Sequence, residues 1–208
     1  MNFKYLGKSN LKVSSYCLGT MTFGETTSES DAHDQINESV SSGINFIDTA
    51  EMYPTCPIRK ETSGETEKII GNWINNNKDK RKDIILATKV VGNGFKYIRD
   101  GGPITKETIK VALHGSLKRL KTDYIDLYQL HWPNRGSYHF RSYWNYKPEK
   151  QDSKNITDEF LDIINTLNDF KKEGLIRAIG VSNETCWGVM RLNEIIKDIE
   201  NLCIASIQ

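Results

Sequence analysis

Residues 44–90 contain a strand, a helix and a second strand in succession. The first strand reads Ile44-Asn45-Phe46-Ile47-Asp48-Thr49, and the second reads Ile84-Ile85-Leu86-Ala87-Thr88-Lys89-Val90. Between them, residues 64–77 carry isoleucines and a tryptophan at helical spacing. Apolar, β-branched strands that are joined by a helix are typical of a parallel sheet buried on both faces. The stretch therefore predicts an α/β fold.

The same alternation continues on both sides of this stretch. Further strands are predicted at residues 17–21, 124–130, 176–181 and 203–207. Further helices are predicted at residues 29–42 after Ser28, at 105–120 with Thr105 as cap, from Thr157 to Gly174, and at 184–199. Residues 1–14 have the pattern of a small β-hairpin. An open doubly wound sheet and a (β/α) barrel both agree with this order of elements.

Composition narrows the functional classes. The 208 residues carry 28 basic and 27 acidic side chains, which gives a net charge of +1. This charge lacks the basic excess that is typical of a nucleic-acid-binding protein. No stretch approaches the roughly 18 apolar residues of a membrane span, and the first residues lack a signal-peptide core. The cysteines are too widely spaced for a zinc site or a disulfide scaffold: Cys17, Cys56, Cys186 and Cys203. We expect a single cytoplasmic domain over residues 1–208, with no metal.

A long irregular segment over residues 132–155 interrupts the repeat. It is rich in aromatic residues: Trp132, Tyr138, Phe140, Tyr143, Trp144 and Tyr146. Loops of this length in compact domains are functional or disordered, and the aromatic content argues against disorder. We interpret it as a substrate-pocket loop. The alternative is a loop that packs on its own domain without a ligand.

Polar side chains stand where three predicted strands end. Asp48 and Lys89 lie near the ends of their strands, His131 follows residues 124–130, and Tyr53 comes five residues after Asp48. Because the C-terminal ends of parallel strands converge on the ligand site, we expect these four side chains to meet at one mouth. Separately, each has a plain structural interpretation: a buried Asp48–Lys89 salt bridge, a structural histidine, a packed tyrosine. Their combination favours function.

The chemistry of the four groups is coherent. A phenol has a pKa near 10, and a nearby ammonium lowers that pKa. A carboxylate keeps the ammonium charged and positioned, and a neutral imidazole can hydrogen-bond a carbonyl oxygen. Tyr53 would then donate a proton to an oxygen that gains negative charge. Such a site reduces a carbonyl if a hydride is supplied.

These residues lie in motifs that resemble the aldo-keto reductases across nearly the whole chain. The motifs, in order, are Gly19-Thr20-Met21-Thr22-Phe23-Gly24, Ile47-Asp48-Thr49-Ala50-Glu51-Met52-Tyr53, Ala87-Thr88-Lys89-Val90, Asp126-Leu127-Tyr128-Gln129-Leu130-His131-Trp132-Pro133 and Ile179-Gly180-Val181-Ser182-Asn183. Two further details, Glu51-Met52-Tyr53-Pro54 and Val181-Ser182-Asn183-Glu184-Thr185, resemble most the Tas-type bacterial subgroup of NADP(H)-dependent enzymes. Pro54 stands where many members have glycine.

The resemblance implies a (β/α)8 TIM barrel closed at its bottom by the hairpin of residues 1–14. It implies that Tyr53 is the general acid/base, tuned by Lys89 and Asp48, in the reduction of aldehydes or ketones by NADPH. His131 would orient the carbonyl and Trp132 would line the pocket. The residues implied to contact the cofactor are Gly19, Thr20, Met21, Asp48, Ser182, Asn183 and Gln208.

The resemblance also implies that part of the barrel is missing. Six strands are predicted instead of eight, and the sequence stops at Gln208, so we expect a truncated barrel. With two open edges, such a chain should be poorly stable, aggregation-prone or rescued by association. The choice of NADPH rests on resemblance alone. The alternative function is a catalytically inactive fragment, or a regulatory subunit that senses the nicotinamide redox state.

Overall fold

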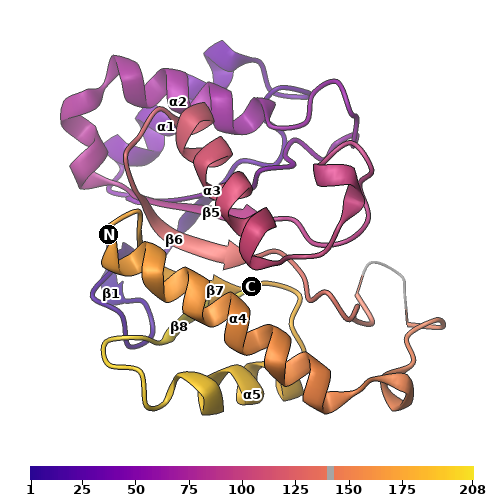
Figure 1. Cartoon of the computed structure of the whole chain (residues 1–208). Coiled ribbons are helices and arrows are strands. Elements are labelled where there is room, and N and C mark those ends of the chain that lie inside the picture. The colour runs from indigo at the N-terminus through magenta and orange to yellow at the C-terminus, as the bar shows by residue number, and fades with distance from the viewer. Residues whose placement is uncertain (140–142) are drawn as a thin grey trace.

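A computed structural model of the protein describes residues 1–139 and 143–208. Six parallel strands form one curled sheet in sequential order, and this partial barrel confirms the predicted fold (Figure 1). The strands are β3 (Cys17–Gly19), β4 (Phe46–Asp48), β5 (Ile85–Val90), β6 (Ile125–Leu130), β7 (Ile176–Val181) and β8 (Ile204–Ile207). Among the described residues, β3 and β8 are the edge strands.

Helices cover the outer face of the sheet. They are α1 (Glu29–Ser41), α2 (Glu65–Asn76), α3 (Lys106–Leu120), α4 (Ser153–Lys172) and α5 (Cys186–Ile196), with short 3₁₀ turns η1 (Lys78–Asp83), η2 (Arg99–Gly101) and η3 (Pro148–Lys150). Their apolar stripes pack against the outward side chains of the strands in one large core. As predicted, Ser28 and Thr105 cap the first turns of α1 and α3.

Helix α4 begins earlier than its sequence predicts. Asp152 is the capping residue, and its carboxylate accepts hydrogen bonds from the backbone N–H groups of Lys154 and Asn155. Thr157 lies inside the helix, where its hydroxyl bonds to the carbonyl of Ser153. The predicted start at Thr157 is therefore wrong. The irregular segment ends at Asp152, and Phe140, Arg141 and Ser142 lie outside the described residues.

An N-terminal hairpin lies at one end of the sheet. Strands β1 (Phe3–Tyr5) and β2 (Lys12–Ser14) pair antiparallel, and Leu11 and Val13 pack among the inward apolar side chains of the strands. The Asn45 side chain accepts a hydrogen bond from the Ser14 N–H at 2.8 Å and so joins the hairpin to the start of β4. In Figure 1 the hairpin lies on the left, whereas the tip of β6 points to the right.

The inner face of the sheet changes character along the strands. Apolar residues near the hairpin, such as Ala87 and Leu127, pack with one another. Two positions further along each strand, on the same face, stand Lys89 and Gln129. The alternation of a β-strand therefore places the buried polar groups at the end away from the hairpin.

Candidate active site

A buried ion pair forms the floor of the site. Lys89 is 1% exposed, and its Nζ donates to Asp48 Oδ2 at 2.6 Å and to the Thr49 carbonyl at 2.9 Å. The side-chain amides of Gln129 and Gln208 also donate to Asp48, each at 3.2 Å. The predicted Asp48–Lys89 salt bridge is present, and strands β4, β5, β6 and the end of β8 all contribute to it.

Tyr53 and His131 lie above this floor. The Lys89 Nζ is 5.0 Å from the centre of the Tyr53 ring, and the Tyr53 and His131 rings meet edge to face at 5.7 Å. The Tyr53 carbonyl accepts hydrogen bonds from the N–H groups of Gly64 and Thr66, which fixes the loop at the start of α2. The structure thus brings the four sequence-predicted side chains together.

The pKa of Tyr53 moves opposite to the expectation. Burial, followed by the Asp48 carboxylate, raises that pKa to about 12, so the predicted lowering is wrong. The physical reason is that burial disfavours the charged phenolate and that the negative charge of Asp48 repels it. Burial also lowers the pKa of Lys89, although the Asp48 charge opposes that shift. At neutral pH the Tyr53 phenol carries its proton.

The imidazole of His131 is neutral at neutral pH. Burial is the larger cause, and the Lys89 charge the smaller one, of a pKa lowered to about 3. Its Nδ1 is buried without a hydrogen-bond partner among the described residues. A neutral ring carries one N–H, which suits it to hydrogen-bond a carbonyl oxygen.

A set of polar groups at the ends of β7 and β8 lies beside the four residues Asp48, Tyr53, Lys89 and His131. Ser182 is buried, and the Asn183 side-chain amide donates to the Ser182 hydroxyl at 2.9 Å and to the His131 carbonyl at 3.0 Å. The Asn183 backbone N–H donates to the Gln208 carbonyl at 3.0 Å. No described residue donates to Asn183 Oδ1. Asn183 Oδ1 can therefore accept a hydrogen bond from the NH₂ group of a carboxamide, and the neighbouring Ser182 hydroxyl can donate one to the carboxamide oxygen.

The segment after β3 borders the same floor. Gly19 pairs with Asp48 in the sheet, and the Thr20 hydroxyl donates to the Asp48 carbonyl at 2.8 Å. Thr20 is fully buried, and its hydroxyl is used in this hydrogen bond to the backbone. Met21, which the resemblance assigns to the cofactor side, lines the cavity that contains Tyr53 and His131.

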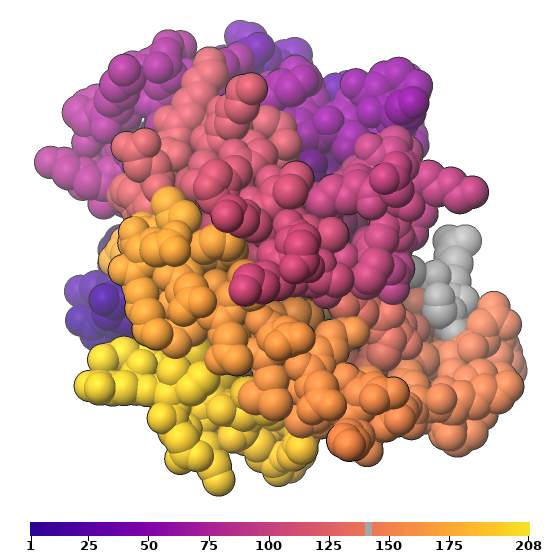
Figure 2. All heavy atoms as spheres, in the orientation of Figure 1, coloured from indigo at the N-terminus to yellow at the C-terminus, as the bar shows by residue number. Residues whose placement is uncertain are grey.

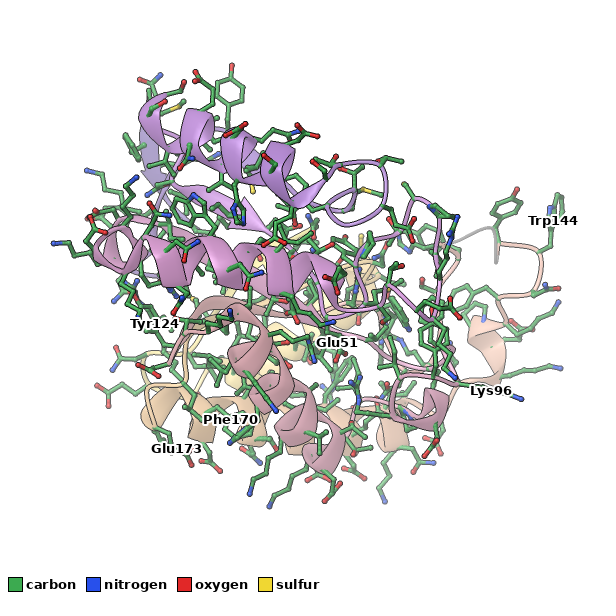
Figure 3. The ribbon with its side chains drawn as sticks, turned by 90° about the horizontal axis from the view of Figure 1, so that it is seen from above. Glu51, Lys96, Tyr124, Trp144, Phe170 and Glu173 are labelled. Carbon is green, nitrogen blue, oxygen red and sulfur yellow. The ribbon has the colours of Figure 1, made fainter. Side chains whose placement is uncertain are left out.

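That cavity has a volume of about 830 Å³ and opens above Tyr53, His131 and Trp132. Trp132 stacks at a tilt on His131, with the rings 4.8 Å apart. The loop after β6 contributes Tyr146 to the cavity wall, whereas Trp144 is 82% exposed and extends away from the body (Figure 3). In Figure 2 the described residues of this loop form a lobe at the lower right. Of the aromatic residues described in the predicted pocket loop, therefore, only some line the cavity.

Two features of the site were not predicted. Gln129 donates a hydrogen bond to Asp48. The sequence signal for this contact is that Gln129 stands two positions after the inward-facing Leu127, and so on the same face of the strand. The Glu51 carboxylate, which lies in the interior in Figure 3, accepts hydrogen bonds from both Nη atoms of Arg99 at 2.6 and 2.7 Å. This ion pair joins the loop of Tyr53 to the segment after β5. Burial raises the pKa of Glu51 despite Arg99.

Other classes of site are absent from the described part of the chain. Across residues 1–139 and 143–208, no group of three His, Cys, Asp or Glu side chains could hold a metal ion. None of the helices described there is long and apolar enough to cross a membrane.

Comparison with known proteins gives a consistent result. Residues 16–208 match the model of the Aldo/keto reductase family. Protein tas of Escherichia coli is 45% identical over 194 residues, which are 92% of this chain and 54% of that protein. Norsolorinic acid reductase B of Dothistroma septosporum is 30% identical and is covered over 46% of its length. The chain spans about half the length of the curated relatives it matches.

Two solved structures share the fold. The holo form of aldo-keto reductase AKR11C1 from Bacillus halodurans is 34% identical, with a TM-score of 0.69, and this chain covers 56% of it. The thermostable aldo-keto reductase Tm1743, in complex with the inhibitor epalrestat, is 27% identical, with a TM-score of 0.68 and 62% coverage. In both comparisons the whole of this chain is matched.

Proposed function

The chain belongs to the aldo/keto reductase family, and on that premise we propose that it reduces aldehydes or ketones to alcohols with NADPH. The observation that carries the proposal is the meeting of Tyr53, Lys89, Asp48 and His131 at the mouth of one apolar cavity. The substrate is a small molecule, and the expected compartment is the cytoplasm. No nucleic acid or membrane takes part.

Tyr53 is the general acid of this reaction. Its phenol is protonated at neutral pH because burial and Asp48 hold its pKa at about 12. As the carbonyl carbon receives a hydride, the oxygen gains negative charge and takes the Tyr53 proton, which leaves an alcohol and a phenolate. The Lys89 ammonium near the ring stabilises that phenolate, and Asp48 holds the ammonium in place.

His131 and the cavity wall position the substrate. The neutral imidazole donates its one N–H to the carbonyl oxygen and does not compete with Tyr53 as an acid. Trp132, Phe95 and Met52 give the cavity an apolar lining. A volume of about 830 Å³ suits a bulky apolar or aromatic carbonyl compound.

The polar groups at the ends of β7 and β8 fit the nicotinamide end of the cofactor. Ser182, Asn183 and Gln208 would hold its carboxamide, with Asn183 Oδ1 as the free acceptor. Gly19, Thr20, Met21 and Asp48 would border the ring. NADPH supplies the hydride when it is bound. The preference for NADPH over NADH is proposed from family membership.

The test is the Tyr53→Phe variant, which removes the proton and keeps the ring. We expect reduction of an aromatic aldehyde to fall by about 10²–10⁴-fold, while NADPH affinity and the thermal midpoint stay unchanged. In the wild type the rate should be flat from pH 6 to 9, because the phenol is protonated far below its pKa of about 12.

Two results would count against the proposal. Turnover by Tyr53→Phe at the wild-type rate excludes Tyr53 as the acid. A wild-type chain that binds NADPH but reduces no carbonyl favours the other candidate, a nicotinamide-sensing or inactive protein.

A further inference from the structure

A further buried ion pair lies at the wall of the cavity that contains Tyr53 and His131. Arg135 follows β6, Glu184 follows β7, and their side chains are only 5% and 4% exposed. Arg135 Nη1 donates to Glu184 Oε2 at 3.0 Å, and Nη2 donates to Glu184 Oε1. Nη2 also donates to the Thr185 hydroxyl at 2.9 Å. This two-pronged contact fixes the direction as well as the distance between the two loops.

Two helices confine the pair. The Arg135 guanidinium lies 5.4 Å from the Phe160 ring of α4 and 5.3 Å from the Trp187 ring of α5. A Cβ on Gly188 would stand 2.2 Å from Glu184 Oε1 and 2.5 Å from Arg135 Nη2. The first turn of α5 therefore accommodates the pair only with a glycine at that position.

The pair joins the two halves of the proposed site. On one side, Arg135 and its neighbours Gly136 and Ser137 line the substrate cavity. On the other side, Glu184 directly follows Asn183, whose side chain bonds to the His131 carbonyl and whose backbone has a left-handed φ of 55°. A shift of Glu184 would therefore move the carboxamide-binding residues and the cavity wall together.

Stability alone does not account for this arrangement. Burying two charges is expensive, and well-packed apolar residues of similar volume are often as stable. Arg135 Nε is in addition buried with no hydrogen-bond partner in the described part of the chain, which costs further free energy. What the pair secures is one relative position of two loops.

We propose that Arg135 and Glu184 are positioning residues that couple carbonyl binding to nicotinamide binding, an inference that rests on the proposed function. With the pair intact, a ligand that orders one loop also orders the other, so each ligand tightens the binding of its neighbour. Without the pair, the two loops bind their ligands independently.

The experiment measures this coupling in the 208-residue chain without turnover. Calorimetry gives the Kd of NADP⁺ with and without saturating 4-nitroacetophenone, a ketone with no hydrogen on its carbonyl carbon, so that this pair of ligands cannot exchange a hydride. We expect the ketone to tighten the binding of NADP⁺ by about fivefold or more in the wild type. In Glu184→Gln the ratio of the NADP⁺ Kd without the carbonyl ligand to that with it should fall to about one. Gly188→Ala, which displaces the pair without removing a charge, should do the same.

Glu67→Gln is the matched control. Glu67 is fully buried and binds Arg119 at 2.7 Å between α2 and α3, away from the cavity. This variant should lower the thermal midpoint and keep the wild-type coupling. A merely structural Arg135–Glu184 pair would behave in the same way.

The outcomes separate this inference from the proposed function. Wild-type coupling that persists in Glu184→Gln, or no coupling in the wild type, overturns the inference even where aldehyde is reduced. Coupling that is lost in Glu184→Gln, in a wild type that does not reduce aldehydes with NADPH, supports the inference and overturns the proposed function alone.

Discussion

Two buried carboxylates stand at opposite ends of the central sheet. Asp126, at the start of β6, binds Arg81 at 2.9 Å, Arg177 at 2.5 Å and the Leu86 N–H at 3.0 Å. Asp48, at the end of β4, binds one ammonium at 2.6 Å and two side-chain amides at 3.2 Å. Both are charged groups inside an apolar fold, but their partners differ in kind.

The difference teaches what each end of the barrel does. The guanidinium groups of Arg81 in η1 and Arg177 in β7, with the backbone N–H of Leu86 in β5, tie Asp126 to η1 and to both strands beside β6. None of these groups lines the main cavity. Asp48 instead holds a single ammonium close to the Tyr53 ring, at the cavity mouth. We therefore predict that the hairpin end serves stability and that the other end carries the proposed chemistry.

The largest expected effect is on activity at the Asp48 end. Lys89→Met removes the ammonium beside Tyr53, so the phenolate that forms on proton transfer loses its stabilising charge. We expect aldehyde reduction to fall by at least about 10²-fold. The measurement is the steady-state rate, normalised to the folded fraction from circular dichroism.

Lys89→Met also leaves Asp48 as an uncompensated buried charge, which destabilises the fold. The double variant Asp48→Asn/Lys89→Met removes both charges and should recover much of that stability without recovering the rate. If the double variant regained the rate, the ion pair would be structural, like that of Asp126.

The next effect is on stability at the other end. Asp126→Asn leaves two guanidinium groups without their carboxylate, and breaking a buried pair in this way costs about 3–5 kcal/mol. Urea unfolding should show this loss in the free energy of unfolding. The turnover per folded molecule should match the wild type, and a reduced turnover would contradict the division between the two ends.

How far the sequence predicts these features depends on how local they are. Strand positions and the caps Ser28 and Thr105 follow from short patterns and are confirmed. The start of α4 does not follow from local sequence alone, because Asp152 and Thr157 are both residue types that can cap a helix. In the structure, Arg191 of α5 donates a hydrogen bond to the Thr157 hydroxyl at 3.0 Å. That tertiary contact is not visible in the sequence around either residue.

The site shows the same limit. The convergence of the four polar side chains follows from the rule that parallel strands end at one edge, so their meeting could be predicted. The pKa of Tyr53 could not be predicted, because it depends on how deeply the phenol is buried and on its distance from the Asp48 carboxylate. The Arg135–Glu184 pair joins residues 49 positions apart and leaves no periodic signal.

The smallest expected effect distinguishes the two ends by pH. His131 has a pKa of about 3 in the folded chain because of burial and the Lys89 charge, against about 6.5 when unfolded. Between these values the unfolded chain binds the extra proton, so stability falls as the pH drops below about 6.5. From pH 7.5 to pH 5 this group alone removes about 2 kcal/mol of stability.

Urea unfolding of the wild type and His131→Gln at both pH values isolates that contribution. The variant lacks the group that titrates, so its loss on acidification should be smaller than that of the wild type by about 2 kcal/mol. Asp126→Asn is the matched control from the other end, and it should keep the full wild-type difference between the two pH values. Equal losses in wild type and His131→Gln would mean that His131 titrates near its unfolded pKa. The imidazole would then be charged in mild acid, and the end of the barrel assigned to chemistry would lack its neutral hydrogen-bond donor.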